Sequence, residues 1–254
     1  MTADLDKKYA VEYAVFTDPG TRPVNEDFCG VYASGGGICF VVCDGLGGHG
    51  MGDAASRSVV DSVLSLARER RMDKKFIPEA LPQAQQQLLA LQREQGASQK
   101  MKTTAVAAVT EGKKLFIGHI GDSRLYLFRK GGVALQTQDH SIPQMLVRSG
   151  EIKPSEIRHH PDRNLVMRVL GVPWEKEMLE MEKPQRISEG DTILLCTDGF
   201  WELIEETEMI EMLSAAPDMQ TWLEMMSLRI RQNGENQSMD NFTAIAARFV
   251  KKTH

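Results

Sequence analysis

The stretch Phe40-Val-Val-Cys-Asp44-Gly45 leads an apolar segment into a carboxylate and a glycine, which predicts a buried strand that ends in a tight turn. The same order recurs at Ile193-Leu-Leu-Cys-Thr-Asp198-Gly199, and Asp240-Asn241 stands directly before another apolar segment. A carboxylate next to a buried strand is held rigidly, yet it lies at the edge of the sheet, where a ligand can reach it. We therefore expect these aspartates to line a functional site.

The acidic residues of this pattern favour a metal-dependent enzyme. Asn25-Glu26-Asp27 adds further oxygen donors to those of Asp44, Asp198 and Asp240. Carboxylate and carbonyl oxygens are hard ligands, the kind that magnesium and manganese prefer. The residue types thus predict a magnesium or manganese centre.

Composition limits the class of protein and its partners. The 254 residues are 42% hydrophobic, enough for a substantial core, and the lack of a repeat or linker favours one domain over 1–254. A net charge of -5 without a long basic run argues against a nucleic-acid partner. No apolar run is long enough to span a membrane, and the start of the chain lacks a secretory leader, so we expect no membrane partner. The four cysteines lack zinc spacing and resemble reduced core residues, which favours a cytoplasmic protein.

The apolar patterns predict strands and pairs of helices in alternation. Strands are expected over 9–17, 26–33, 38–43, 104–109, 114–120, 125–128, 133–137, 192–197 and 243–250, and helices follow 52, span 81–91, and cover 206–214 and 217–232. The close spacing of the four runs between 104 and 137 leaves no room for crossover helices, so we expect one antiparallel meander. The whole pattern predicts an α+β fold, a four-layer αββα sandwich in which two stacked, mainly antiparallel sheets lie between helix pairs.

A rival interpretation arises from the loop Gly45-Leu46-Gly47-Gly48-His49-Gly50, which matches the GxGxxG pattern of dinucleotide-binding proteins. In such proteins the following helix leads to a parallel strand with an acidic residue roughly 20 residues beyond the loop. Here a second, glutamine-rich helical segment follows instead, and Asp44 has no role. The sequence therefore disfavours a dinucleotide site.

The motifs together resemble the metal-dependent, type 2C protein serine/threonine phosphatases, in particular their bacterial branch. The similarity covers almost the whole chain, with the motifs in family order: Arg22-Pro-Val-Asn25-Glu26-Asp27, Val42-Cys-Asp44-Gly45-Leu46-Gly47-Gly48-His49, Gly118-His-Ile-Gly121-Asp122-Ser123-Arg124, Asp139-His140, Leu195-Cys-Thr-Asp198-Gly199 and Asp240-Asn241-Phe-Thr. Each motif is weak alone, but their shared order is specific.

This resemblance implies two manganese or magnesium ions in one active site, and a third ion that binds more weakly. Asp44 would bridge both ions, the Gly45 carbonyl would complete one, and Asp198 and Asp240 would hold the other. Glu26 and Asp27 would act through metal-bound waters, Asp122 with Asp198 would hold the third ion, and Arg22 would bind the substrate phosphate. The resemblance implies hydrolysis of phosphoserine and phosphothreonine by a metal-bridging hydroxide. The substrates would be phosphorylated proteins, plausibly a serine/threonine kinase or its targets.

Two positions depart from the family pattern. Leu46 stands where some members carry a histidine as a proposed general acid, so His49 becomes a candidate for that catalytic role. Lys102 stands where a glycine often precedes the paired threonines, and we expect this position to be remote from the metal ligands.

A variable flap is expected over 141–172, and its basic residues either form a rim that attracts a phosphoprotein or belong to an ordinary solvated loop. Asp139-His140 is expected to brace a helix start rather than to touch substrate. A non-catalytic pseudophosphatase that binds phosphoproteins is the alternative function. It predicts missing metal ligands, and the carboxylates are all present.

Overall fold

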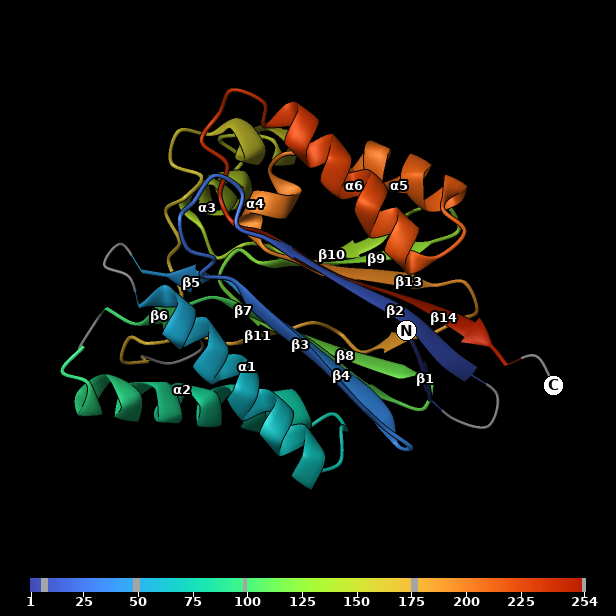
Figure 1. Ribbon diagram of the computed structural model, residues 1–254, viewed down its shortest axis with the longest axis horizontal. Helices are drawn as coiled ribbons and strands as arrows, with labels where there is room; N and C mark the ends of the chain where they lie inside the picture. The colour runs from blue at the N-terminus through green and yellow to red at the C-terminus, as the bar shows by residue number, and fades with distance from the viewer. Residues whose placement is uncertain (6–8, 48–50, 98–99, 175–177, 253–254) are drawn as a thin grey trace.

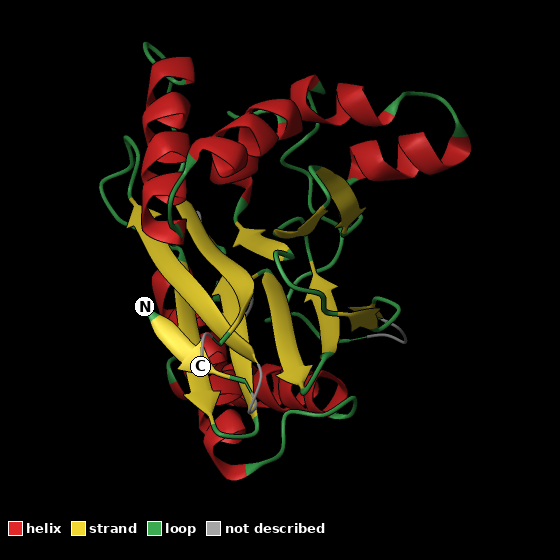
Figure 2. Ribbon diagram, turned by 90° about the vertical axis from the view of Figure 1, so that its right-hand side faces the viewer, coloured by secondary structure: helices red, strands yellow, loops and turns green. Residues whose placement is uncertain are grey.

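The computed structural model describes residues 1–5, 9–47, 51–97, 100–174 and 178–252. Two helices, α1 (Gly52–Glu69) and α2 (Phe76–Glu94), cover the lower side of the molecule in Figure 1, and α5 (Glu206–Ala215) and α6 (Met219–Asn233) cover the upper side. The strands occupy the middle in this view and in the view of Figure 2. The layers therefore follow the order helix, sheet, sheet, helix.

Each of the two large sheets is antiparallel throughout its described pairings. The sheet beside α1 and α2 has the order β11-β8-β7-β4-β3, with β12 also paired to β8, and the sheet beside α5 and α6 has the order β1-β2-β14-β13-β9-β10. The bounds of the first sheet are β3 Phe28–Ser34, β4 Gly37–Cys43, β7 Ala105–Glu111, β8 Lys114–Ile120, β11 Glu180–Met181 and β12 Gln185–Arg186. Those of the second are β1 Thr2–Asp4, β2 Tyr9–Asp18, β9 Arg124–Arg129, β10 Gly132–Gln136, β13 Thr192–Cys196 and β14 Phe242–Lys251.

Strand β4 shows why its sequence is apolar at every position. Side chains alternate between the two faces of a strand. Cys39, Val41 and Cys43 pack with the core under α1 and α2, whereas Phe40 and Val42 pack with the core between the two sheets. The strand is buried along its whole length, as the unbroken apolar run predicted.

The meander expected between 104 and 137 is wrong, because the four strands belong to two different sheets. The hairpin β7–β8 lies in one sheet and the hairpin β9–β10 in the other. The chain crosses between the sheets at Gly121, which has a φ of 104° and would bring a Cβ atom within 2.6 Å of the Thr104 side chain. The short spacing between strands predicts that consecutive strands run antiparallel. It does not predict that the chain changes sheet at a glycine turn.

Short elements complete the fold around one end of the sheets. The segment expected as an insertion carries α3 (Ile142–Ser149) and the 3₁₀ helix η1 (Pro154–His159). Several short elements were not expected, among them β5 (Gly45–Leu46), its partner β6 (Lys102–Thr103), and α4 (Asp198–Trp201) directly after β13. None of the described helices is both long and apolar enough to cross a membrane.

Candidate metal centre

The predicted aspartates gather around a cavity of about 850 Å³ at the end of both sheets. Asp44 follows β4 of one sheet, whereas Asp198 follows β13 and Asp240 precedes β14 of the other. The cavity is lined by Arg22, Glu26, Asp44, Gly45, Asp198 and Asp240, together with neighbouring loop and flap residues. Segments far apart in the sequence thus bring most of the predicted site residues to one place.

Asp27 and Asp122 lie behind this cavity rather than on its wall. Asp27 is 6% exposed, and its Oδ2 accepts a hydrogen bond of 2.8 Å from the hydroxyl of Thr197, the residue before Asp198. Asp122 is 2% exposed, and its Oδ1 has no hydrogen-bond partner among the described residues. A buried carboxylate oxygen without a partner is costly, which marks Asp122 as a group that a cation would stabilise. His49, the candidate proton donor, lies outside the described residues.

Backbone packing holds the Asp44 turn in place. The Asp44 amide donates to Thr104 Oγ1 at 3.1 Å, and the Asp44 carbonyl accepts from the Thr104 amide at 2.9 Å and the Thr103 hydroxyl at 2.7 Å. A methyl group at Gly45 would collide with the carbonyl oxygens of Gly52 and Glu26. The glycine after Asp44 is therefore required by close backbone approach, and the paired threonines fix the position of the carboxylate.

A second set of contacts joins the Glu26 loop to the Asp240 turn. The side-chain oxygen of Asn241 accepts from the Glu26 amide at 2.7 Å, and Glu26 Oε1 accepts from the Gly52 amide, at the start of α1, at 3.2 Å. Arg22 donates from Nη2 to Asp240 Oδ2 at 2.9 Å, and half of its side chain is exposed. The arginine thus lies at the mouth of the cavity, beside a predicted metal ligand.

Burial and mutual repulsion raise the pKa values of the central carboxyl groups. Loss of solvation is the largest cause for Asp44 and Asp122, whose pKa values lie well above the usual range, and the neighbouring Asp198 is the next cause for both. Burial also raises the pKa of Asp27 to about 8 and that of Asp198 to about 7. Several carboxylates without a matching cation are the electrostatic setting of a site that binds positive charge.

Lys102 is a residue whose predicted place was wrong. We expected it to be remote from the metal ligands, but it lines the same cavity as Asp44 and Asp198. Strand β6 pairs with β5 so that Lys102 lies opposite Leu46, two residues after Asp44. No local pattern in the sequence indicates the pairing of two such short strands.

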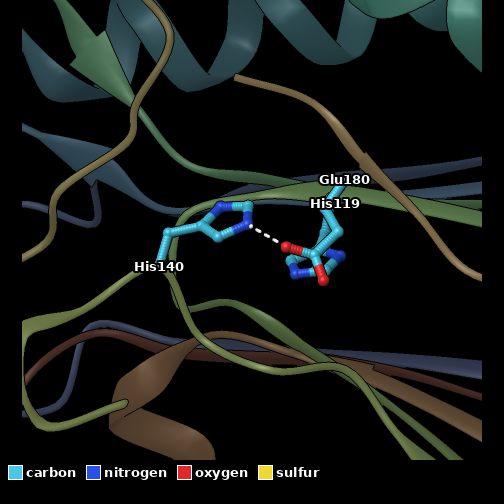
Figure 3. Close-up of side chains that lie close together, drawn as sticks. All are labelled: His119, His140 and Glu180. Carbon is cyan, nitrogen blue, oxygen red and sulfur yellow. Dashed lines mark hydrogen bonds and ion pairs between the residues drawn. The ribbon is translucent and has the colours of Figure 1, made fainter. Parts of the chain in front are cut away.

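Three side chains outside the predicted centre also come within 4.8 Å of one another through atoms able to bind a metal: His119, His140 and Glu180. Figure 3 shows the His140 ring directed toward the Glu180 carboxylate, to which Nε2 makes a hydrogen bond of 3.0 Å. The Gly121 amide donates to His140 Nδ1 at 3.0 Å, so the ring proton of neutral His140 is on Nε2. His140 therefore offers Glu180 a donor rather than a metal-binding lone pair, and the group braces the turn before Asp122.

The basic residues of the flap are largely paired within the molecule. Arg158 contacts Glu206 at 2.8 Å, Arg163 contacts Glu202 at 3.0 Å, and Arg168 lies 3.9 Å from Glu180. These pairs neutralise much of the charge that the sequence assigned to a rim. Glu202 also adds a carboxylate near Asp198 that motif reasoning missed, because its place one helical turn later carries no recognisable pattern.

Comparison with known proteins places this geometry in a family. The family model described as protein phosphatase 2C matches residues 21–243. The serine/threonine phosphatase stp of Listeria monocytogenes is 31% identical over 237 residues, which cover 90% of this chain and 92% of that protein.

Solved structures agree with this result. Stp1 from Staphylococcus aureus superposes with a TM-score of 0.83 at 30% identity and 94% coverage of both chains. The catalytic domain of PstP, whose structure contains two manganese ions, has a TM-score of 0.80 at 29% identity, with 95% of this chain and 99% of that chain covered. The chain belongs to the protein phosphatase 2C family. The family and the αββα sandwich predicted from the sequence are thereby confirmed.

Proposed function

We propose that this chain is a metal-dependent protein serine/threonine phosphatase that hydrolyses phosphoserine and phosphothreonine on proteins. The observation that carries the proposal is the group of carboxylates on the cavity wall and directly behind it, whose pKa values are raised by loss of solvation and by one another. Divalent cations would remove this repulsion, and two such ions can catalyse phosphoryl transfer to water. The two manganese ions of the related PstP catalytic domain support the same centre here.

The donor set fits manganese or magnesium, because every side chain in it offers hard oxygen atoms. We assign two ions to Asp44, the Gly45 carbonyl, Asp198 and Asp240, and a third, weaker ion to Asp122 with Asp198. Glu26 and Asp27 would hold waters around these ions. The observation that favours the third position is Asp122 Oδ1, which has no hydrogen-bond partner among the residues that the structure describes.

When bound, the two cations would lower the pKa of a water molecule and polarise a phosphoryl oxygen. Arg22 would bind the other phosphoryl oxygens, since a guanidinium group matches phosphate with two parallel donors. No protein nucleophile is needed, and the cysteines are poorly suited to be one. Burial raises the pKa values of Cys29 and Cys39 to about 12, which keeps both thiols protonated. Water would therefore attack phosphorus directly.

The same proposal extends to the cellular role. The whole chain would act as one catalytic domain, with 141–172 as a flap beside the cavity. The substrates would be phosphoproteins of a signalling pathway in the cytoplasm, where free thiols such as those of the four cysteines persist. A serine/threonine kinase or its targets would be the natural partners, because a phosphatase resets what a kinase modifies.

The direct test is hydrolysis of a phosphothreonine peptide by the purified protein in EDTA, magnesium or manganese. We expect activity only with a divalent metal, and none in the Asp198→Asn variant. Folded wild-type protein that is inactive with every metal would contradict the proposal and would favour the binding-only alternative.

A further inference from the structure

Lys102 lies between the Asp44 turn and the flap. Strand β6 pairs with β5 on one side, and on the other Thr103 exchanges hydrogen bonds of 3.2 and 2.8 Å with Leu170. Lys102 is half-buried and lines the cavity with Arg22 and the central aspartates. Its position is therefore set by two backbone pairings rather than by a free surface loop.

Within the described part of the chain, the charge of Lys102 has no partner. Lys102 makes no side-chain hydrogen bond or ion pair with any described residue, whereas Arg22 is paired with Asp240, and Arg158 and Arg163 are paired with glutamates. Arg22 and Lys102 are the two basic residues on the described cavity wall. Once cations neutralise the carboxylates, the Lys102 ammonium group, with its three donors, remains available to an anion that enters from solvent.

The surroundings of Lys102 favour such an anion. Leu165, Val166 and Val169 of the flap line the same cavity, and the Leu165 side chain is among the exposed large hydrophobic groups. A substrate that covers these apolar groups would exclude water, which strengthens a contact between opposite charges. The anion of a phosphoprotein at this point is a phosphoryl oxygen or a carboxylate beside the phosphorylated residue.

We propose that Lys102 is a substrate-binding residue, which contacts an anionic group of the phosphorylated substrate from the wall of the cavity that β6 forms. This inference rests on the proposed function.

The experiment compares Lys102→Met, Lys102→Arg and Lys102→Gly with the manganese-loaded wild type. Methionine keeps much of the length of the side chain without the charge, arginine keeps the charge, and glycine removes the side chain. Lys114→Met is the matched control, because Lys114 is exposed on β8 and does not line the cavity. Substrates are phosphothreonine peptides with acidic or neutral flanks and para-nitrophenyl phosphate, and inorganic phosphate serves as a competitive inhibitor.

We expect Lys102→Met and Lys102→Gly to raise KM about tenfold with little change in kcat, the size expected for one lost charge-assisted hydrogen bond. Lys102→Arg should restore KM, and the difference from wild type should shrink at high ionic strength. A contact with the phosphoryl group would raise KM for all substrates and weaken inhibition by phosphate. A contact with a flanking carboxylate would raise KM for the acidic peptide alone.

Unchanged KM values and phosphate inhibition in Lys102→Met, beside an active wild type, would overturn the inference and leave the proposed function intact. A loss of kcat in Lys102→Met and Lys102→Arg alike, without a change in KM, would also overturn it, since a purely structural residue behaves this way. An inactive wild type would instead overturn the proposed function and the inference with it.

Discussion

Two neighbouring groups of buried charges in this molecule are built in opposite ways. The Arg124 guanidinium is 4% exposed and binds both oxygens of buried Asp139 at 2.8 and 2.7 Å, and it lies 3.4 Å from the centre of the Trp201 ring. Asp122, two residues before Arg124, has a buried oxygen that finds no hydrogen-bond partner in the described part of the chain, and it faces the repulsion of Asp198. In the Arg124–Asp139 group, each charge has a partner of opposite sign. In the group around Asp122 and Asp198, negative charges lie beside one another.

The difference separates structural charge from functional charge. Burial alone lowers the pKa of Arg124, but Asp139 more than offsets this and holds the pKa well above its usual value, so the ion pair persists at any physiological pH. Burial raises the pKa of Asp44, and its acidic neighbours raise it further. A matched pair therefore stays charged inside the protein, whereas a cluster of acidic groups without a matching cation is left in need of one.

The largest effect on activity should come from substitutions in the acidic cluster of Asp44, Asp122 and Asp198. Asp44→Asn should lower kcat/KM for a phosphopeptide by roughly a thousandfold or more, because an amide cannot replace a charged ligand of two cations. The metal-free variant should be at least as stable as wild type, since a repulsive charge is gone. Kinetics and urea unfolding measure the two quantities.

Asp191→Asn is the matched control for Asp44→Asn. Asp44 is half-buried on the cavity wall, whereas Asp191 is buried, is paired with Arg129 at 2.6 Å and lies outside the cavity. This variant should lose stability and keep its kcat/KM. Equal losses of activity in both variants would show that burial alone, rather than the unmatched charge, decides the outcome.

Substitutions in the Arg124–Asp139 pair should change the stability of the fold. Arg124→Met leaves Asp139 buried without a cation, and we expect a loss of about 3–5 kcal/mol in the free energy of unfolding. The double variant Arg124→Met, Asp139→Asn should recover much of this loss, because no charge remains unpaired. Urea unfolding of the single and double variants is the measurement. Additive losses in the double variant would be inconsistent with a matched pair.

Metal-free stability should fall as pH rises. The folded-state pKa values of Asp27, about 8, and Asp198, about 7, lie above the value of about 4 for an unfolded aspartate. The folded state then binds protons more tightly, so their stabilising effect is full below about pH 4 and is lost as pH rises toward 8. The loss is up to about 1.4 kcal/mol per pH unit for each group.

Urea unfolding of the metal-free protein between about pH 5 and pH 8 tests this sign. Asp198→Asn should flatten the slope, and manganese should reverse it, because cations replace the bound protons. A free energy of unfolding of the metal-free protein that increases over this pH range would contradict the prediction. It would mean that groups of the protein itself already stabilise the charged carboxylates.

Arg22 should give a smaller, kinetic effect. Arg22→Ala removes the guanidinium at the cavity mouth and should raise KM for the phosphopeptide about tenfold, with a smaller change in kcat. Arg71, which is exposed and paired with Glu111 away from the cavity, provides the control, and Arg71→Ala should leave KM unchanged. An unchanged KM in Arg22→Ala would return Arg22 to a structural role beside Asp240.

The sequence predicted the strands and the site carboxylates because both follow local patterns. The alternation of β4 between two cores made its apolar run continuous, and the Asp-Gly pairs at Asp44 and Asp198 marked the ends of β4 and β13. The change of sheet at Gly121 depends instead on which strands pair, which no local pattern records. The same holds for Lys102, whose approach to Asp44 follows from the two-residue pairing of β5 and β6.

The sequence motifs also did not predict which acidic residues are buried. Asp27 looks like a neighbour of Glu26 in the sequence, but in the fold it lies behind the cavity against Thr197. Adjacent residues of an extended segment face opposite sides, and only the packed structure shows which side is the interior.

The central claim is that the buried carboxylates form a site for divalent cations, and calorimetric titration of metal-free protein with manganese tests it most directly. We expect two ions to bind the wild type, with a rise in the unfolding temperature, and both effects to be lost in Asp44→Asn but kept in Asp191→Asn. Wild-type protein that binds no manganese, or an Asp44→Asn variant that binds it equally well, would contradict the account.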